Sequence, residues 1–182
     1  MALRPILQYP APVLKQPAAA VGNIGGDVVQ LVEDMAETMY AAPGVGLAAP
    51  QVGVGQRIIV LDVRSGDDEP GKQLLKLINP TITEREGEIV WEEGCLSVPD
   101  FTAPVTRARR ILVRAWTPDE REVQIEAEEF LAVALQHEID HLEGKLFLDR
   151  LSRLKRDLYR ARRKKLARQG KASSGSGRPL LI

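Results

Sequence analysis

The two histidines of this 182-residue chain lie four residues apart, in the segment His137-Glu138-Ile139-Asp140-His141. On an α-helix this spacing puts both imidazoles on one face, one turn apart, where both reach a single metal ion. Glu138 would then flank a water bound to that ion and serve as its general base. The sequence therefore predicts a metal site that performs hydrolysis.

A third metal ligand is needed, because a catalytic divalent ion commonly has three protein ligands and keeps one position for water. The chain has no further histidine, and no glutamate follows Glu143. Asp149 and Asp157 are downstream candidates, and Cys95 is the one soft ligand upstream. Cys95 has no second cysteine with which to form a disulfide, so its alternative role is that of a small buried apolar residue. Gly94 lets the backbone pass close to an ion and favours Cys95 as the ligand.

The segment that carries both histidines, residues 127–143, has no glycine or proline before Gly144. This composition predicts a helix that ends in a glycine cap. Phe130, Val133 and Ala134 fall on one helical stripe with the histidines. The metal site is therefore expected at the end of an apolar groove.

Other segments predict a helix and several strands that position this site. A helix is expected from Asp27, as its N-cap, to about Pro43, because apolar residues recur there at steps of three and four. The prolines between Pro5 and Pro17 predict an extended opening segment. Strands are expected at 57–63, 74–78, 89–91, 110–116 and 122–125. Strands followed by a helix, without regular βα alternation, predict an α+β fold with antiparallel sheets.

The net charge of zero conceals a strong asymmetry along the chain. Residues 150–182 carry twelve lysines or arginines and one acid, a charge of +11, which leaves −11 on residues 1–149. We expect a single domain at 1–149, a basic helix at 150–168 and a flexible tail at 169–182. The helix has leucines along one side. It suits either a docked helix with a solvated face or an arm that binds RNA phosphates.

No run of about 18 apolar residues occurs in the sequence, and its first residues lack the apolar region of a secretory signal. We therefore expect a cytoplasmic protein that does not enter a membrane.

Three motifs occur in a fixed order and together resemble those of the peptide deformylases. They are Gly44-Val45-Gly46-Leu47-Ala48-Ala49-Pro50-Gln51, Glu93-Gly94-Cys95-Leu96-Ser97 and Gln136-His137-Glu138-Ile139-Asp140-His141. Peptide deformylases remove the formyl group from the initiator methionine of nascent bacterial chains, and the likeness runs from about Ile6 to Leu151. It implies antiparallel sheets packed around a central metal-bearing helix. It also implies the ligands Cys95, His137 and His141.

The resemblance implies further roles near the metal. Ferrous iron is the usual ion of the family, and zinc, nickel or cobalt can take its place. The side-chain amide of Gln51 and the backbone N–H of Leu96 would stabilise an oxyanion while Glu138 transfers protons. Glu93, paired with Arg107, would support a metal ligand.

The substrate implied by the family is an N-formylmethionyl nascent peptide, which is cleaved to release formate. Its methionine side chain would occupy an apolar slot, and Gly46 would keep the site narrow enough to select formyl groups. The slot residues are Val45, Trp91, Phe130, Val133 and Ala134. Family members with a basic extension are thought to dock on ribosomes through it.

Two other functions fit parts of the sequence. A zinc endopeptidase would use Asp149 or Asp157 as its third ligand and would tolerate Cys95→Ser. An RNA-associated module would hold a purely structural metal, with no open position for water.

Overall fold

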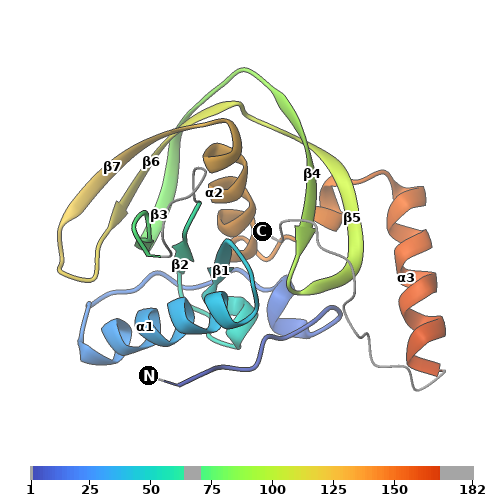
Figure 1. The fold of residues 1–182 in the computed structure, drawn as a ribbon, viewed down its shortest axis with the longest axis horizontal. Coiled ribbons are helices and arrows are strands. Elements are labelled where there is room, and N and C mark those ends of the chain that lie inside the picture. Colours follow the sequence, from blue (N-terminus) through green and yellow to red (C-terminus); the bar gives the residue numbers. More distant parts are fainter. Residues whose placement is uncertain (1, 64–70, 169–182) are drawn as a thin grey trace.

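Three α-helices and seven strands make up the part of the chain that this computed structural model describes, residues 2–63 and 71–168 (Figure 1). The α-helices are α1 (Gly26–Ala41), α2 (Glu129–Leu142) and α3 (Arg153–Arg168). The strands are β1 (Gly46–Ala48), β2 (Ile58–Leu61), β3 (Leu75–Glu86), β4 (Ile89–Cys95), β5 (Val98–Arg107), β6 (Arg110–Trp116) and β7 (Glu122–Glu128). Short 3-10 helices lie at η1 (Pro12–Lys15), η2 (Ala49–Val52) and η3 (Phe147–Arg150).

The strands form two antiparallel sheets, which confirms the predicted α+β fold. Five strands pair in the order β1-β2-β3-β6-β7, and β4 pairs with β5 in a separate hairpin. Figure 1 shows α2 near the centre of the molecule, between the two sheets, and α1 beneath β1 and β2. The helix that carries both histidines is thus the central element of the fold.

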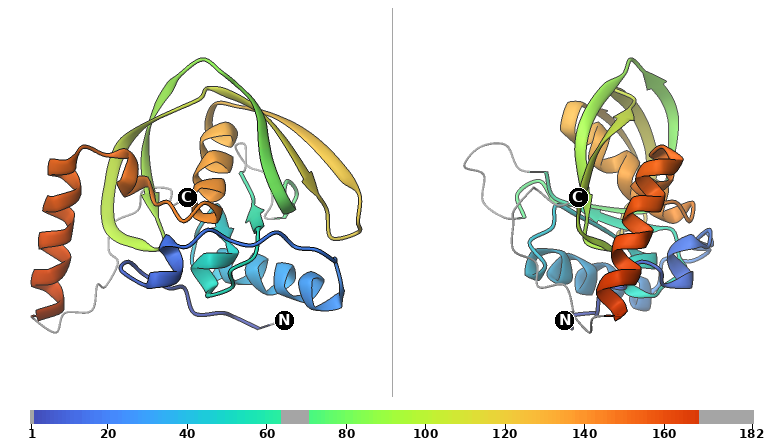
Figure 2. Two further views of the ribbon diagram at one scale, coloured as in Figure 1. Left: turned by 180° about the vertical axis from the view of Figure 1, so that it is seen from behind. Right: turned by 90° about the vertical axis from the view of Figure 1, so that its right-hand side faces the viewer.

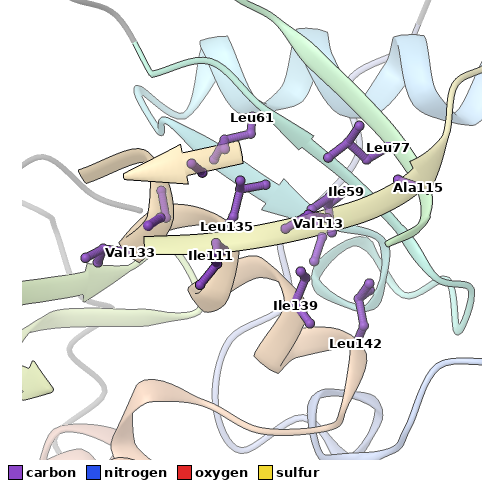
Figure 3. Close-up of a cluster of buried hydrophobic side chains, with 14 of the residues drawn as sticks. Ile59, Leu61, Leu77, Ile111, Val113, Ala115, Val133, Leu135, Ile139 and Leu142 are labelled. Carbon is purple, nitrogen blue, oxygen red and sulfur yellow. The ribbon is translucent and has the colours of Figure 1, made fainter. Parts of the chain in front are cut away.

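Strand β2 is covered on both faces, because successive side chains of a strand point to opposite sides. Ile58 and Val60 pack with the buried residues of α1, whereas Ile59 and Leu61 pack with those of α2. Figure 3 shows the second of these clusters, in which Leu135 and Ile139 of α2 lie against side chains of β2, β3 and β6. This packing fixes the position of α2 against the five-stranded sheet.

Helix α2 begins two residues later and ends one residue earlier than the predicted 127–143, and the predicted glycine cap follows it. Strand β7 continues through Glu128, and Glu129, with a φ of 51°, turns the chain sharply into the helix. At the other end Gly144 has a φ of 67°. Its N–H donates to the His141 carbonyl (3.1 Å), and the Lys145 N–H donates to the Asp140 carbonyl (2.9 Å), which is a Schellman cap.

Several element boundaries differ from the sequence prediction. The N-cap of α1 is Gly25, not Asp27, which lies in the first turn of the helix. Strands β1 and β5 were not predicted. β5 contains two prolines and Asp100 with a φ of 59°, features that read as a loop in the sequence.

Helix α3 contacts the body through a different face from the leucine side expected from the sequence. Tyr159 is buried and its ring lies 4.9 Å, centroid to centroid, from Phe101 of β5. Leu154 and Leu158 are instead 70% and 62% exposed. Both views in Figure 2 show α3 standing beside the β4–β5 hairpin. The leucines are therefore free to contact another molecule.

The division into a catalytic domain at 1–149, a basic helix at 150–168 and a tail at 169–182 remains a prediction. Residues 169–182 lie outside the described residues.

Within the described ranges, no helix combines the length and apolar composition needed to cross a membrane.

Candidate metal centre

Cys95, His137 and His141 converge although Cys95 and His137 are 42 positions apart in the sequence. Their ligand atoms all lie within 4.8 Å of one another, and all three side chains are buried. Cys95 Sγ is 3.3 Å from His141 Nε2. Ligands bound to one tetrahedral ion at about 2.0–2.3 Å lie roughly 3.6 Å apart, so this spacing suits a single ion.

The nitrogen atoms of the two imidazoles are arranged as metal binding requires. His137 Nδ1 lies 2.8 Å from Glu93 Oε2, which leaves Nε2 buried and without a hydrogen-bond partner among the described residues. Burial, followed by the charge of His137, holds the pKa of His141 well below its ordinary value, so this imidazole is neutral as a ligand must be. The donor set therefore fits a divalent ion.

Cys95 is the last residue of β4 and directly precedes the two-residue turn, Leu96-Ser97, that joins β4 to β5. Burial, followed by the charge of Glu138, raises the pKa of the thiol. A bound cation reverses this effect, because a coordinating thiol is deprotonated outright. Backbone N–H groups of Ser97 and Val98 donate to the sulfur and also favour the thiolate.

Glu138 is fully buried, and neither of its carboxylate oxygens has a hydrogen-bond partner within the described part of the chain. Burial, followed by the nearby charge of Glu93, raises its pKa well above the ordinary value. An unpaired buried carboxylate is costly, and such groups are typical of sites where a proton is moved. Glu138 thus has the environment of a general base.

Gln51, in η2, points its amide nitrogen at the metal ligands. Its Oε1 accepts the Ala48 N–H at 2.8 Å, which fixes the orientation of the amide. Its Nε2 then lies 3.2 Å from Ser97 Oγ and 3.7 Å from Cys95 Sγ. Leu96 directly follows Cys95 in the chain, and its N–H remains the second predicted oxyanion donor.

A family model described as polypeptide deformylase matches residues 3–157. The chain belongs to the peptide deformylase family. A peptide deformylase from Syntrophobacter fumaroxidans is 50% identical over 172 residues, which cover 94% of this chain and 100% of that protein. One from Alkalilimnicola ehrlichii is 50% identical over 96% of this chain and 97% of its own length. Membership confirms the resemblance drawn from the three motifs.

Solved structures of the family have the same fold as this chain. A peptide deformylase from Legionella pneumophila superposes with a TM-score of 0.85, at 43% identity and with 94% of this chain and 100% of that chain covered. The enzyme from Ehrlichia chaffeensis in complex with actinonin has a TM-score of 0.85 at 39% identity, with coverages of 92% and 99%.

Glu93 and Arg107, expected beside the ligands of a deformylase, form a buried pair behind His137. Arg107 donates from Nε to Glu93 Oε1 at 2.6 Å and from Nη2 to Oε2 at 2.9 Å. Burial raises the pKa of Glu93, but the hydrogen bonds from Arg107 and His137 outweigh it and leave the pKa lowered. An ionised Glu93 holds the His137 ring in one orientation.

The five residues expected to hold methionine in a deformylase lie in one apolar cluster. Val133 and Ala134 are fully buried, and Val45 is nearly so. Trp91 and Phe130 stack with centroids 5.1 Å apart and remain partly exposed. The two aromatic rings are therefore the members of this group that a substrate can reach.

The alternative ligands of an endopeptidase lie elsewhere. Asp149 accepts the Leu146 N–H at 2.9 Å and pairs with Lys15, and Asp157 pairs with arginines of α3. Both are therefore engaged in other contacts.

Two polar residues near the site were not predicted from the sequence. Asp140 is bonded to Arg107, and Arg150 is bonded to Asp140. The sequence carries no signal for either contact.

Gly46 lies against the carboxylate of Glu138. A Cβ at this position would overlap Glu138 Oε1 and lie 2.8 Å from Glu138 Cδ and 2.9 Å from Leu61 Cδ1. We expect Gly46→Ala to displace the carboxylate and lower kcat/KM by about 100-fold, as small misplacements of catalytic groups do. Gly55→Ala, whose Cβ would meet nothing within 4 Å, is the matched control in the same assay. A Gly46→Ala rate equal to that of the control would show that the carboxylate tolerates displacement.

Proposed function

We propose that this protein hydrolyses the N-formyl group of N-formylmethionyl peptides, releasing formate and a free amino terminus. The observation that carries the proposal is the buried, unpaired carboxylate of Glu138 beside the three metal-ligand atoms that lie within 4.8 Å of one another. Membership of the peptide deformylase family supports the choice of substrate.

Each residue of the proposed site has a distinct task in this reaction. A divalent ion, when bound, would supply a water of lowered pKa and a Lewis acid for the formyl carbonyl. Glu138 takes the proton of the attacking water on its carboxylate and passes it to the leaving amine. Gln51 Nε2 and the Leu96 N–H donate hydrogen bonds to the oxygen that becomes negatively charged. Cys95, His137 and His141 are the proposed ligands of the ion.

Selection of formyl groups is assigned to the narrow space at Gly46, where even a Cβ on residue 46 itself would overlap Glu138. A formyl carbon carries only hydrogen where other acyl groups carry a substituent. The methionine side chain is proposed to lie against the stacked rings of Trp91 and Phe130. Val45, Val133 and Ala134 support these rings from within the core.

Formate release from a short formyl-Met peptide tests the proposal directly. Anaerobically purified protein should release formate, and a chelator should stop the reaction. A peptide of the same sequence with a free amino terminus, examined for internal cleavage, separates a deformylase from an endopeptidase. Cleavage of internal bonds without formate release would refute the assignment.

The proposed ion is ferrous iron, on the strength of the family's usual metal. A thiolate with two imidazoles binds iron, zinc, nickel or cobalt, so the ligand set alone does not choose among them. Metal analysis of protein purified without air should find about one iron per chain. Zinc at that level under the same conditions would replace iron in the proposal.

The proposed site of action is the cytoplasm, where formylated chains are synthesised, and α3 is the proposed contact with the ribosome. Lys155, Arg162, Lys164 and Lys165 are all exposed on this helix. Clustered cations of this kind bind RNA phosphates by releasing counterions. The exposed Leu154 and Leu158 add an apolar surface between these charges.

Charge reversal on α3 separates ribosome binding from catalysis. The test variant has Lys155, Arg162, Lys164 and Lys165 all replaced by Glu. We expect it to deformylate a short peptide at about the parent rate. Its sedimentation with bacterial ribosomes should fall sharply, and binding by the parent should show a steep dependence on salt.

Arg163 is left unchanged in this variant, because its Nη2 donates to Gln8 Oε1 at 3.4 Å and to the Tyr9 carbonyl at 3.5 Å. The docking of α3 on the body is thereby preserved. Equal sedimentation of parent and variant at low salt would leave α3 as a docked helix with a solvated face.

A further inference from the structure

Arg150 lies at the far end of a chain of charged hydrogen bonds that begins at His137. The first links are the contacts of His137 Nδ1 with Glu93 and of Glu93 with Arg107, described above. Arg107 has one more donor in use: its Nη1 lies 2.5 Å from Asp140 Oδ2. Asp140 in turn accepts Arg150 Nε on Oδ2 at 2.6 Å and Arg150 Nη2 on Oδ1 at 2.7 Å.

The charges in this chain balance only when Arg150 is included. Glu93 and Asp140 are two buried carboxylates, and Arg107 is one buried cation between them. Without Arg150, the single guanidinium of Arg107 would have to compensate both carboxylates. Removing one partner of a buried ion pair is strongly destabilising, because the charge that remains is no longer compensated. Arg107 would then hold Glu93, and so the His137 ring, less firmly.

The element that carries Arg150 also contacts His137 directly. η3 begins at Phe147, whose buried ring stacks on His137 with centroids 6.1 Å apart and an interplanar angle of 28°. Asp149 fixes the same turn by accepting the Leu146 N–H and by pairing with Lys15. Arg150 is therefore presented to Asp140 by a turn that is held at both ends.

Arg150 itself lies away from the reacting groups. Its side chain is 39% exposed and lines a cavity of about 600 Å³ with Arg57, Arg85 and Lys145. None of the proposed metal ligands lines that cavity. The hydrogen bonds of Arg150 therefore connect it to the metal site through Asp140.

We propose that Arg150 is a positioning residue for His137, acting through Asp140, Arg107 and Glu93. The proposal rests on the metal-binding role proposed above for His137. Partners that orient a metal-binding histidine typically change metal affinity or activity by about 10–100-fold when they are removed. Because Arg150 is several contacts from the ion, we expect the lower end of that range.

The test compares Arg150→Gln with Arg153→Gln in nickel-loaded protein. Arg153 is the matched control, since its side chain is 90% exposed and its ion pair with Asp157 has a separation of 3.7 Å. The measurement is the rate at which nickel passes to excess chelator, with the absorption spectrum of the cobalt-loaded form as a second readout. Arg150→Gln should release nickel about tenfold faster and alter the cobalt bands. Arg153→Gln should match the parent, and Arg150→Lys, which restores the charge, should recover part of the difference.

A double-mutant cycle with Asp140→Asn tests the route of the effect. If Arg150 acts through Asp140, the double variant should release nickel no faster than Asp140→Asn alone. Independent, multiplying effects would overturn the proposal, as would parent-like release from Arg150→Gln. A parent protein that holds no nickel would instead refute the proposed metal role of His137. Thermal unfolding of the nickel-loaded variants identifies any general loss of stability, which would accelerate release without changing the cobalt bands.

Discussion

Replacing Glu138 by Gln should leave about one metal ion per chain and lower kcat by about 10²–10⁴-fold, the usual contribution of a general base. The amide has the shape of the carboxylate but cannot accept a proton from water. Neither oxygen of Glu138 bonds to another described side chain, so the substitution breaks no contact that holds the fold. Formate release and metal analysis on the same preparation measure the two quantities.

Glu143→Gln provides the matched control on the adjoining turn. Glu143 is the C-cap of α2 and pairs with Arg57 at 2.7 Å on the surface, outside the proposed site. The Glu143→Gln variant should retain the metal content and the catalytic rate of the parent. Activity of Glu138→Gln within tenfold of the parent would remove Glu138 from the role of base. Loss of metal in that variant would instead make Glu138 a ligand.

The parts of the site that depend on local spacing could be predicted from the sequence. His137 and His141 lie one helical turn apart wherever a helix forms, and α2 forms because 129–142 lacks glycine and proline and has an apolar side. The C-terminal cap at Gly144 followed from residue type in the same way. Cys95 was a candidate from the residues and became a specified ligand through the family motif.

The contacts of Arg150 could not be predicted, because they depend on where η3 packs against α2. Nothing in the sequence near residue 150 indicates a bond to Asp140, and the surrounding arginines suggested a basic tail. The leucines of α3 show the same limit, because local spacing does not say which side of a helix docks. Their helical spacing correctly predicted a stripe, but the docked side chain is Tyr159, since the aromatic cluster with Phe101 is formed by residues distant in sequence.

Replacing Cys95 by Ala should remove most of the bound metal and nearly all activity. One of the three proposed ligands is lost, so the drop in metal affinity should exceed the ~10–100-fold that follows loss of an outer partner. The buried site then keeps two imidazoles, which bind a divalent ion weakly without the charge of a thiolate. Metal content after dialysis against a weak chelator, followed by formate release, measures the effect.

Two further variants separate ligation by Cys95 from packing by Cys95. The residue belongs to a buried apolar cluster with Val98, its partner across the Leu96-Ser97 turn. Val98→Ala removes apolar contacts from that cluster and should lower thermal stability while the metal content stays near one. Cys95→Ser keeps the size of the side chain but offers a hydroxyl, which is a much poorer ligand for a soft metal, and should therefore resemble Cys95→Ala. Normal metal content and rate in Cys95→Ser would mean that the sulfur only fills space and that another group completes the metal site.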